Sequence, residues 1–204
     1  MKEVILESNI VLKVPTDYEV DLTLGKDLVN FCRNNRPHVY NKTAIVTNKD
    51  YGQLGFELLG LGTTNHVCFI ESTDLDLEMH KQIANDFSLS YHVSGYVSTD
   101  LKNINEENKF DLVVGQIPTV DNFLEHIDFF TFVKNNMNLT GDMYLIEPKD
   151  TNLLRMCAEK YGMIYKGTFN SKNWALMYFK QTHDAETKES KLKLPNFLSS
   201  KYTV

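Results

Sequence analysis

The sequence of 204 residues lacks long apolar runs, long runs of basic residues and paired cysteines. No stretch approaches the roughly 18 consecutive apolar residues that a membrane helix needs. Residues 1–7 also lack the basic-then-apolar order of a signal peptide. The three cysteines, Cys32, Cys68 and Cys157, lie far apart in apolar segments, which is typical of buried thiols in a reducing compartment. We therefore expect a cytoplasmic protein that makes no contact with membranes.

The motifs of several common sites are also missing. There is no P-loop sequence, no intact glycine fingerprint of dinucleotide-binding proteins and no nucleophile elbow. The six histidines have no metal-like spacing, so we expect no metal site. The net charge of −6 argues against a general nucleic-acid binder, although a local basic patch on an acidic chain would still allow RNA to bind.

What the sequence does contain is an alternation of short apolar runs with amphipathic segments. Strands buried on both faces of a parallel sheet are almost wholly apolar. The apolar runs therefore predict strands at 43–47, 66–70, 92–97, 110–115 and 142–147. The segments around them carry apolar residues at helical spacing and predict helices at 21–35, 52–60, 74–87, 121–137 and 151–161.

The last two strands differ from the others in how they are connected. Segments 163–168 and 174–179 are separated by only five residues, too few for a helical crossover, so they predict an antiparallel hairpin. An α/β fold with a mostly parallel sheet and a C-terminal antiparallel hairpin resembles the Rossmann-like sheet of class I methyltransferases. We expect a lead-in segment at 1–20, one domain at 21–181 and a polar linker or tail at 182–204.

Ligands of open α/β sheets bind beyond the carboxyl ends of the strands, so the loop after the first strand is the first candidate site. Methyltransferases that use S-adenosylmethionine usually have an acidic residue near the end of this strand, followed by three spaced glycines. Val46 stands at the acidic position, and Asn48, Asp50 and Gly52 stand at the glycine positions, with Gly55 farther on. Asn and Asp tolerate a positive φ, so the turn could persist without its glycines.

Two acidic residues follow the next two strands. Glu71 ends the second strand, where in this fold a carboxylate accepts hydrogen bonds from both ribose hydroxyls of the cofactor. Asp100, after the third strand, would meet the adenine amine. The alternatives are that Glu71 belongs to the start of the next helix and that Asp100 is an ordinary loop residue.

The third loop, at 115–119, follows the fourth strand. Enzymes that methylate an amide or exocyclic nitrogen place a polar side chain and a proline here, and their acceptors hold the target amine. Gln116 and Pro118 fit these catalytic positions, but Thr119 offers no aromatic face for stacking on a base. The alternative is a proline-containing loop in which Thr119 or Asp121 caps the next helix.

Residues 46–54, Val-Thr-Asn-Lys-Asp-Tyr-Gly-Gln-Leu, and residues 110–119, Phe-Asp-Leu-Val-Val-Gly-Gln-Ile-Pro-Thr, resemble one particular family. Both are similar to the N-terminal domain of the two-domain bacterial rRNA guanine-N2 methyltransferases, a decayed duplicate of the catalytic half. The resemblance covers about 20–181. It implies a domain that binds no cofactor, packs on a catalytic methyltransferase domain and helps to hold RNA. The chain departs from the family in having Thr119 in place of lysine and in lacking the catalytic domain.

Three hypotheses follow. The first is a methyltransferase-fold domain related to RNA-modifying enzymes, with a degenerate cofactor site and a role as a scaffold or in positioning RNA. The second is an active S-adenosylmethionine-dependent enzyme that methylates an RNA base or a protein amide. The third is a protein-interaction module that uses the fold only as a surface.

Overall fold

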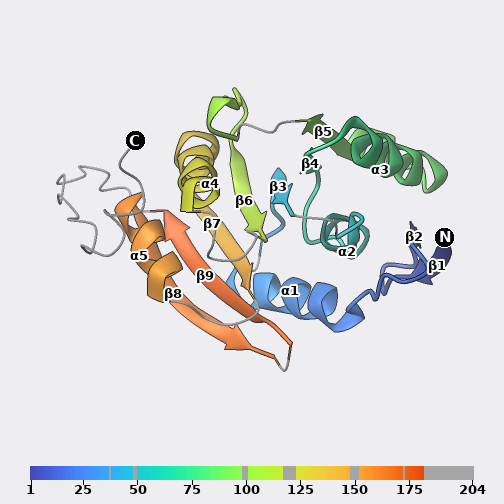
Figure 1. Ribbon diagram of the computed structural model, residues 1–204, viewed down its shortest axis with the longest axis horizontal. Helices are drawn as coiled ribbons and strands as arrows, with labels where there is room; N and C mark the ends of the chain where they lie inside the picture. Colours follow the sequence, from blue (N-terminus) through green and yellow to red (C-terminus); the bar gives the residue numbers. More distant parts are fainter. Residues whose placement is uncertain are drawn as a thin grey trace.

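A seven-stranded sheet with helices on both faces dominates the computed structural model, which describes residues 1–36, 38–47, 50–97, 101–116, 123–147, 152–171 and 173–181 (Figure 1). The strands lie in the order β5-β4-β3-β6-β7-β9-β8. Their bounds are β3 (Thr43–Val46), β4 (Val67–Glu71), β5 (Val93–Val97), β6 (Phe110–Gly115), β7 (Met137–Glu147), β8 (Met163–Asn170) and β9 (Ala175–Gln181).

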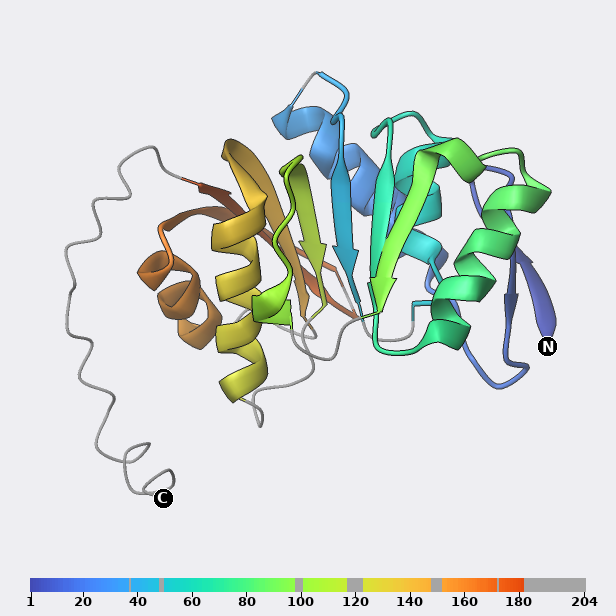
Figure 2. The same ribbon diagram turned by 90° about the horizontal axis from the view of Figure 1, so that it is seen from above.

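The direction of the strands confirms the expected fold class. The five strands from β5 to β7 are mutually parallel, whereas β9 is antiparallel to both β7 and β8. Figure 2 shows the parallel strands running in one direction. The chain starts the sheet at β3, moves outward to β5 and then returns to place β6 on the other side of β3. The strand order therefore reverses between β3 and β6, where this kind of sheet binds its ligands.

Five helices cover the two faces of the sheet. One face carries α1 (Leu22–Asn35), α2 (Gln53–Gly60) and α3 (Asp74–Asp86), and the other carries α4 (Phe123–Asn136) and α5 (Asn152–Lys160) (Figures 1 and 2). Two short 3₁₀ turns, η1 (Ser90–His92) and η2 (Leu101–Asn103), flank β5. Within the described residues no helix is both long enough and apolar enough to cross a membrane.

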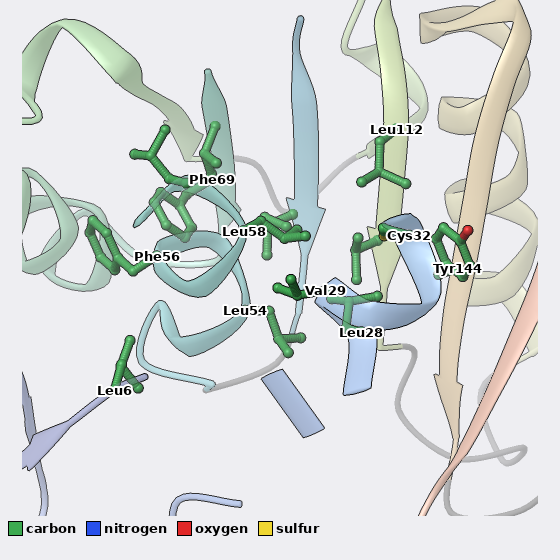
Figure 3. Packing of buried hydrophobic residues seen from close by; sticks show 14 of the residues in the cluster. Leu6, Leu28, Val29, Cys32, Leu54, Phe56, Leu58, Phe69, Leu112 and Tyr144 are labelled. Carbon is green, nitrogen blue, oxygen red and sulfur yellow. The ribbon is translucent and has the colours of Figure 1, made fainter. Parts of the chain in front are cut away.

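The core consists of two apolar clusters, one on each face of the sheet. Figure 3 shows the first, in which Leu28 and Cys32 of α1 and Leu54 of α2 lie over the sheet. The second packs α4 and α5 against the opposite face and includes Phe130 and Leu154. The alternation of side chains along each strand supplies both clusters, which is why the parallel strands are apolar throughout.

The lead-in segment forms a hairpin of β1 (Lys2–Ile5) and β2 (Val11–Val14). Its turn is fixed to α2 by Glu57, whose buried carboxylate accepts hydrogen bonds from the N–H groups of Glu7 at 2.9 Å and Ser8 at 3.1 Å. Leu12 and Val14 join the first apolar cluster. The hairpin is therefore packed against the rest of the described structure.

The main difference from the expected elements is the start of β7. The sequence predicted a helix through Met137 and a strand from Asp142, but the helix ends at Asn136 and the strand begins at once with Met137. Gly141 lies inside the strand, where a Cβ atom would approach the Met137 side chain to 2.5 Å and the Asn138 carbonyl oxygen to 2.8 Å. The prediction failed because Met137 continues the apolar spacing of α4 without a break.

A buried aspartate joins three parts of the sheet. Asp142 of β7 is fully buried and accepts hydrogen bonds from the hydroxyl groups of Tyr40 at 2.8 Å and Tyr178 at 2.9 Å. Tyr40 precedes β3, and Tyr178 lies on β9. Nη1 of Arg36, at 3.8 Å from Oδ2, adds a positive charge nearby. A buried carboxylate needs such partners, because an unpaired charge inside a protein is costly.

We predict that Tyr40→Phe lowers the free energy of unfolding by about 1–3 kcal/mol, because it deprives the buried Asp142 carboxylate of one donor. Urea denaturation measures the change. Tyr91→Phe is the control, since Tyr91 is 95% exposed and should tolerate the loss of its hydroxyl. Equal stability of Tyr40→Phe and the wild type would contradict the assigned role of this hydrogen bond.

Candidate functional site

The carboxyl ends of the parallel strands meet at one edge of the sheet. β3 ends at Val46, β4 at Glu71, β6 at Gly115 and β7 at Glu147. Val46 is paired with Gly115 across the switch in strand order. The loops that the sequence analysis singled out all begin at this edge. Asn48, Asp100 and Pro118 lie outside the described residues, whereas Asp50, Gly52, Gly55, Glu71 and Gln116 are described.

Asp50 is buried and caps the start of α2. Its Oδ1 accepts a hydrogen bond from the N–H of Gly52 at 3.0 Å, and its Oδ2 accepts one from the N–H of Leu54 at 3.2 Å. The first N–H groups of a helix have no partner within the helix and attract anions. The Asp50 carboxylate therefore occupies a position that would otherwise attract the carboxylate of a ligand.

The turn before α2 adopts its left-handed conformation at Tyr51, with φ of 54°, and at Gly52, with φ of 83°. The sequence suggested that Asp50 would adopt a positive φ in this turn. Asp50 is not among the residues with positive φ, and Tyr51 adopts that conformation instead. The Tyr51 ring packs edge-on against Tyr18, with the ring centroids 4.5 Å apart. Burial, together with the nearby Asp50 charge, raises the pKa of Tyr18 to about 12.

The two glycines that remain here both make close contacts with the protein itself. A Cβ atom at Gly52 would lie 2.8 Å from Nδ1 of His80 and 2.8 Å from the Phe56 ring. A Cβ atom at Gly55, inside α2, would lie 2.5 Å from the Phe69 ring. Each glycine thus has a packing reason of its own, since it lets α2 approach β4 and α3.

Glu71 forms a hydrogen-bonded pair with His80 of α3. The distance from Oε1 of Glu71 to Nε2 of His80 is 2.7 Å, and a proton on Nε2 makes the histidine the donor. Glu71 is 6% exposed and His80 is fully buried, with its ring lying over Phe69 at 4.2 Å. Burial raises the pKa of Glu71, and its hydrogen bond to His80 opposes that shift. One of the two Glu71 oxygens, which were expected to accept hydrogen bonds from a ribose, therefore already accepts a hydrogen bond inside the protein.

Gln116 lies at the strand switch, directly after β6. Its backbone N–H donates a hydrogen bond to the Val46 carbonyl at 2.9 Å and so extends the pairing of β3 with β6 by one residue. Its side chain is half-buried. Gln116 thus lies at the carboxyl edge of the sheet, and its catalytic role stays a prediction.

Glu147, at the end of β7, was not recognised from the sequence. It is 4% exposed, and its Oε1 has no hydrogen-bond partner among the residues that the structure describes. Burial alone raises its pKa to about 7. Oγ1 of Thr47, just after β3, is also buried without a partner. Glu147 could have been identified from the sequence, because it is an acidic residue at the end of an apolar strand. The same feature identified Glu71.

His80 was also missed, because its spacing from Leu77 and Ile83 is that of an ordinary residue on the buried face of α3. Across the described part of the chain, no group of three or more His, Cys, Asp or Glu side chains could hold a metal ion.

No protein-family model matches this chain, and no curated protein matches it. Solved structures do. A candidate RNA methyltransferase from Pyrococcus horikoshii, PH1948, matches with a TM-score of 0.66 at 13% identity, over 85% of this chain and 91% of its own. The candidate methyltransferase yhhF of Escherichia coli matches with a TM-score of 0.65 at 12% identity, over 89% and 99%.

A candidate sarcosine dimethylglycine methyltransferase from Galdieria sulphuraria also matches, with a TM-score of 0.65 at 12% identity, over 79% of this chain and 86% of its own. The fold is therefore that of the class I methyltransferases, which typically use S-adenosylmethionine. At these identities the likeness establishes the fold and leaves the chemistry to the residues of the site.

We predict that His80→Leu lowers the free energy of unfolding by about 3 kcal/mol, because it leaves the buried Glu71 carboxylate without its donor. The double variant Glu71→Leu/His80→Leu should be more stable than His80→Leu, since removing both partners leaves no polar group unpaired. Chemical denaturation of the single and double variants measures this coupling. Additive losses would contradict a tight Glu71–His80 pair.

We further predict a pH dependence that Glu147 controls. Its folded pKa of about 7 exceeds its ordinary value of 4.5, so between these values the folded state binds more protons than the unfolded state. The free energy of unfolding must then fall as the pH rises through this window.

Glu147→Gln should weaken that fall and raise the Tm above that of the wild type at pH 8. Thermal unfolding across the pH range tests this, with the exposed Glu159→Gln as the control. An unchanged pH dependence in Glu147→Gln would contradict the assignment.

Proposed function

We propose that this chain is a methyltransferase-fold domain related to RNA-modifying enzymes, with a cofactor site that its own side chains occupy. In this proposal it does not bind S-adenosylmethionine in the usual way. It acts as a scaffold or RNA-positioning domain beside a catalytic methyltransferase domain.

The bond between Glu71 and His80 is the observation that carries the proposal. A ribose whose two hydroxyl groups donate hydrogen bonds needs a carboxylate with free oxygens, but Glu71 is buried and its Oε1 already accepts a hydrogen bond from His80. Breaking the 2.7 Å hydrogen bond would leave the fully buried His80 ring without its partner. Cofactor binding would therefore have to supply the free energy of this rearrangement in addition to that of ordering the ligand.

The start of α2 supports the same conclusion. The Asp50 carboxylate takes hydrogen bonds from two N–H groups of the helix terminus. A negatively charged methionine carboxylate approaching this terminus would meet a fixed negative charge of its own sign. Two of the contacts that a class I methyltransferase offers its cofactor are thus satisfied internally, one by Asp50 and one by His80.

The role as a scaffold or RNA-positioning domain rests on the motif resemblance and on a structural neighbour that is a candidate RNA methyltransferase. A domain of this fold without its own cofactor would contribute by binding. Its partners would be RNA, a catalytic methyltransferase domain, or both.

A second candidate function, an active N-methyltransferase, is favoured by a different observation. Gln116 follows β6, and Glu147 is the last residue of the neighbouring parallel strand β7, at the carboxyl edge. A carboxylate with a pKa of about 7 at this edge could accept the proton of an amine that the Gln116 amide holds. In this reading, the amine would be the methyl acceptor.

Calorimetric titration with S-adenosylmethionine and with its demethylated product separates the two functions. We predict no saturable heat up to millimolar ligand for the wild type, and none for Glu71→Ala. Micromolar binding that Glu71→Ala abolishes would overturn the proposed function and favour the active enzyme. An unchanged thermal unfolding curve for the isolated protein at high ligand concentration provides the independent check.

The RNA-positioning part of the proposal is tested by filter binding with a structured ribosomal RNA fragment at several salt concentrations. We expect retention without cofactor that weakens as salt rises, because phosphate contacts release counterions. Absence of retention at low salt would contradict RNA positioning.

A further inference from the structure

A serine and a histidine meet at the amino end of the sheet, away from the carboxyl edge. Ser94 lies near the start of β5, the strand at one side of the sheet, and His66 directly precedes β4 (Figure 1). The distance from Oγ of Ser94 to Nε2 of His66 is 2.8 Å. Both side chains are half-buried, so the pair is packed and still reached by solvent. A hydroxyl in hydrogen-bond contact with an imidazole is the arrangement in which a histidine activates a serine.

The backbone of Tyr91 fixes the direction of this hydrogen bond. It forms a second hydrogen bond with the His66 ring. Because Nε2 faces Ser94, the second bond uses Nδ1, which carries the proton that a backbone carbonyl accepts. Nε2 of the neutral ring then has no proton, and the Ser94 hydroxyl is the donor. This is the tautomer that a general base needs.

Cys68 holds Ser94 from its other side. The two residues are cross-strand partners in β4 and β5, and their side chains are hydrogen-bonded. Burial raises the pKa of the Cys68 thiol to about 11, so the thiol keeps its proton at neutral pH and is the donor to Oγ of Ser94. Oγ therefore accepts from Cys68 while it donates to His66. The Ser94 hydroxyl is thereby oriented with its proton toward the histidine.

The surroundings of His66 favour its neutral form. Burial lowers the pKa of His66 most, and the charges of Lys42 and His92 lower it further. The Tyr91 backbone and the charge of Glu106 oppose this shift, but the pKa still falls below its ordinary value of 6.5. At pH 7 the ring is therefore mostly neutral and able to accept a proton.

A cavity of about 470 Å³ opens at this end of the sheet. Its lining is polar, carries charges of both signs, and includes Asn41, Lys42, Lys109 and Asp111. Lys42 is common to the cavity and to the group around His66, because its charge acts on the His66 ring. The cavity thus offers room for a polar ligand in the neighbourhood of the serine and the histidine.

We propose that Ser94 is a nucleophile that His66 activates as a general base, in a site that takes acyl esters with a polar group. Oγ of Ser94 bonds to the acyl carbon while its proton passes to Nε2 of His66. The ester C–O bond then breaks, and His66 gives the proton to the departing alcohol. Water that His66 deprotonates attacks the acyl-serine next, which releases a carboxylic acid and restores Ser94. This inference is independent of the proposed function, because the pair lies at the opposite end of the strands from the carboxyl edge.

Labelling of the full wild-type chain with a fluorophosphonate ester tests the proposal without any variant. An activated serine displaces fluoride from this reagent, so that an O–P bond forms as the P–F bond breaks. We expect one adduct per chain, which peptide mass spectrometry should locate at Ser94. Ser90, an exposed serine on η1, is the control in the same spectra. An unlabelled Ser94, or a Ser90 labelled to the same extent, would overturn the proposal.

Histidine variants test whether His66 acts as the base. His66→Gln should lower the labelling rate of Ser94 about 100-fold or more, because it removes the proton acceptor. His38→Gln, which changes an exposed histidine elsewhere, should leave the rate unchanged. The wild-type rate should rise with pH through a midpoint below 6.5, as His66 loses its proton, and His66→Gln should lack this inflection. Equal rates for His66→Gln and the wild type, or a wild-type rate without the inflection, would contradict the assignment.

Hydrolysis of 4-nitrophenyl acetate tests the assigned class of substrate. We expect the wild type to release nitrophenolate faster than Ser94→Ala, and Ser90→Ala to match the wild type. A Ser94→Ala variant as active as the wild type would contradict acyl transfer at this serine.

Discussion

The hydrogen bond between Glu71 and His80 is the interaction on which the interpretation of the carboxyl edge depends. A partner stabilises a carboxylate that is only 6% exposed, since an isolated charge in the interior is costly. His80 supplies that partner from the middle of α3, and its ring fits between Phe69 and Gly52 because the glycine leaves room for it. The helix, the strand and the turn before α2 are thereby held in one arrangement, in which the acidic residue faces inward.

The fold and its site thus follow separate constraints. The parallel sheet needs only apolar strands of matched length and helices with one apolar face, and the chain keeps both. Cofactor binding needs free carboxylate oxygens and unoccupied helix N–H groups at the carboxyl edge. In the proposed function, Asp50 and His80 satisfy these groups from within the protein. Under this proposal the chain retains the architecture of a methyltransferase while its own residues take over the contacts of the cofactor.

Much of the fold was predictable because it depends on local patterns. The apolar runs gave the parallel strands, and the short connection at 169–173 gave the hairpin. The start of β7 was wrong because Met137 continues the apolar spacing of α4. The Glu71–His80 pair could not be predicted, since it joins a strand end to a helix through side-chain orientations that periodicity does not encode. The Asp50 cap had a sequence signal, an aspartate before a helix, which was interpreted as a replaced glycine instead.

The most direct test of the account is the imidazole signal of His80 in a long-range ¹H–¹⁵N NMR spectrum, recorded with and without saturating S-adenosylhomocysteine. The spectrum reports which ring nitrogen carries the proton and whether its hydrogen bond persists. We predict a protonated Nε2 whose resonance does not change when the ligand is added. A His80 resonance that shifts as ligand is titrated would show that Glu71 is released to bind it, and would contradict the claim that the protein's own side chains occupy this site.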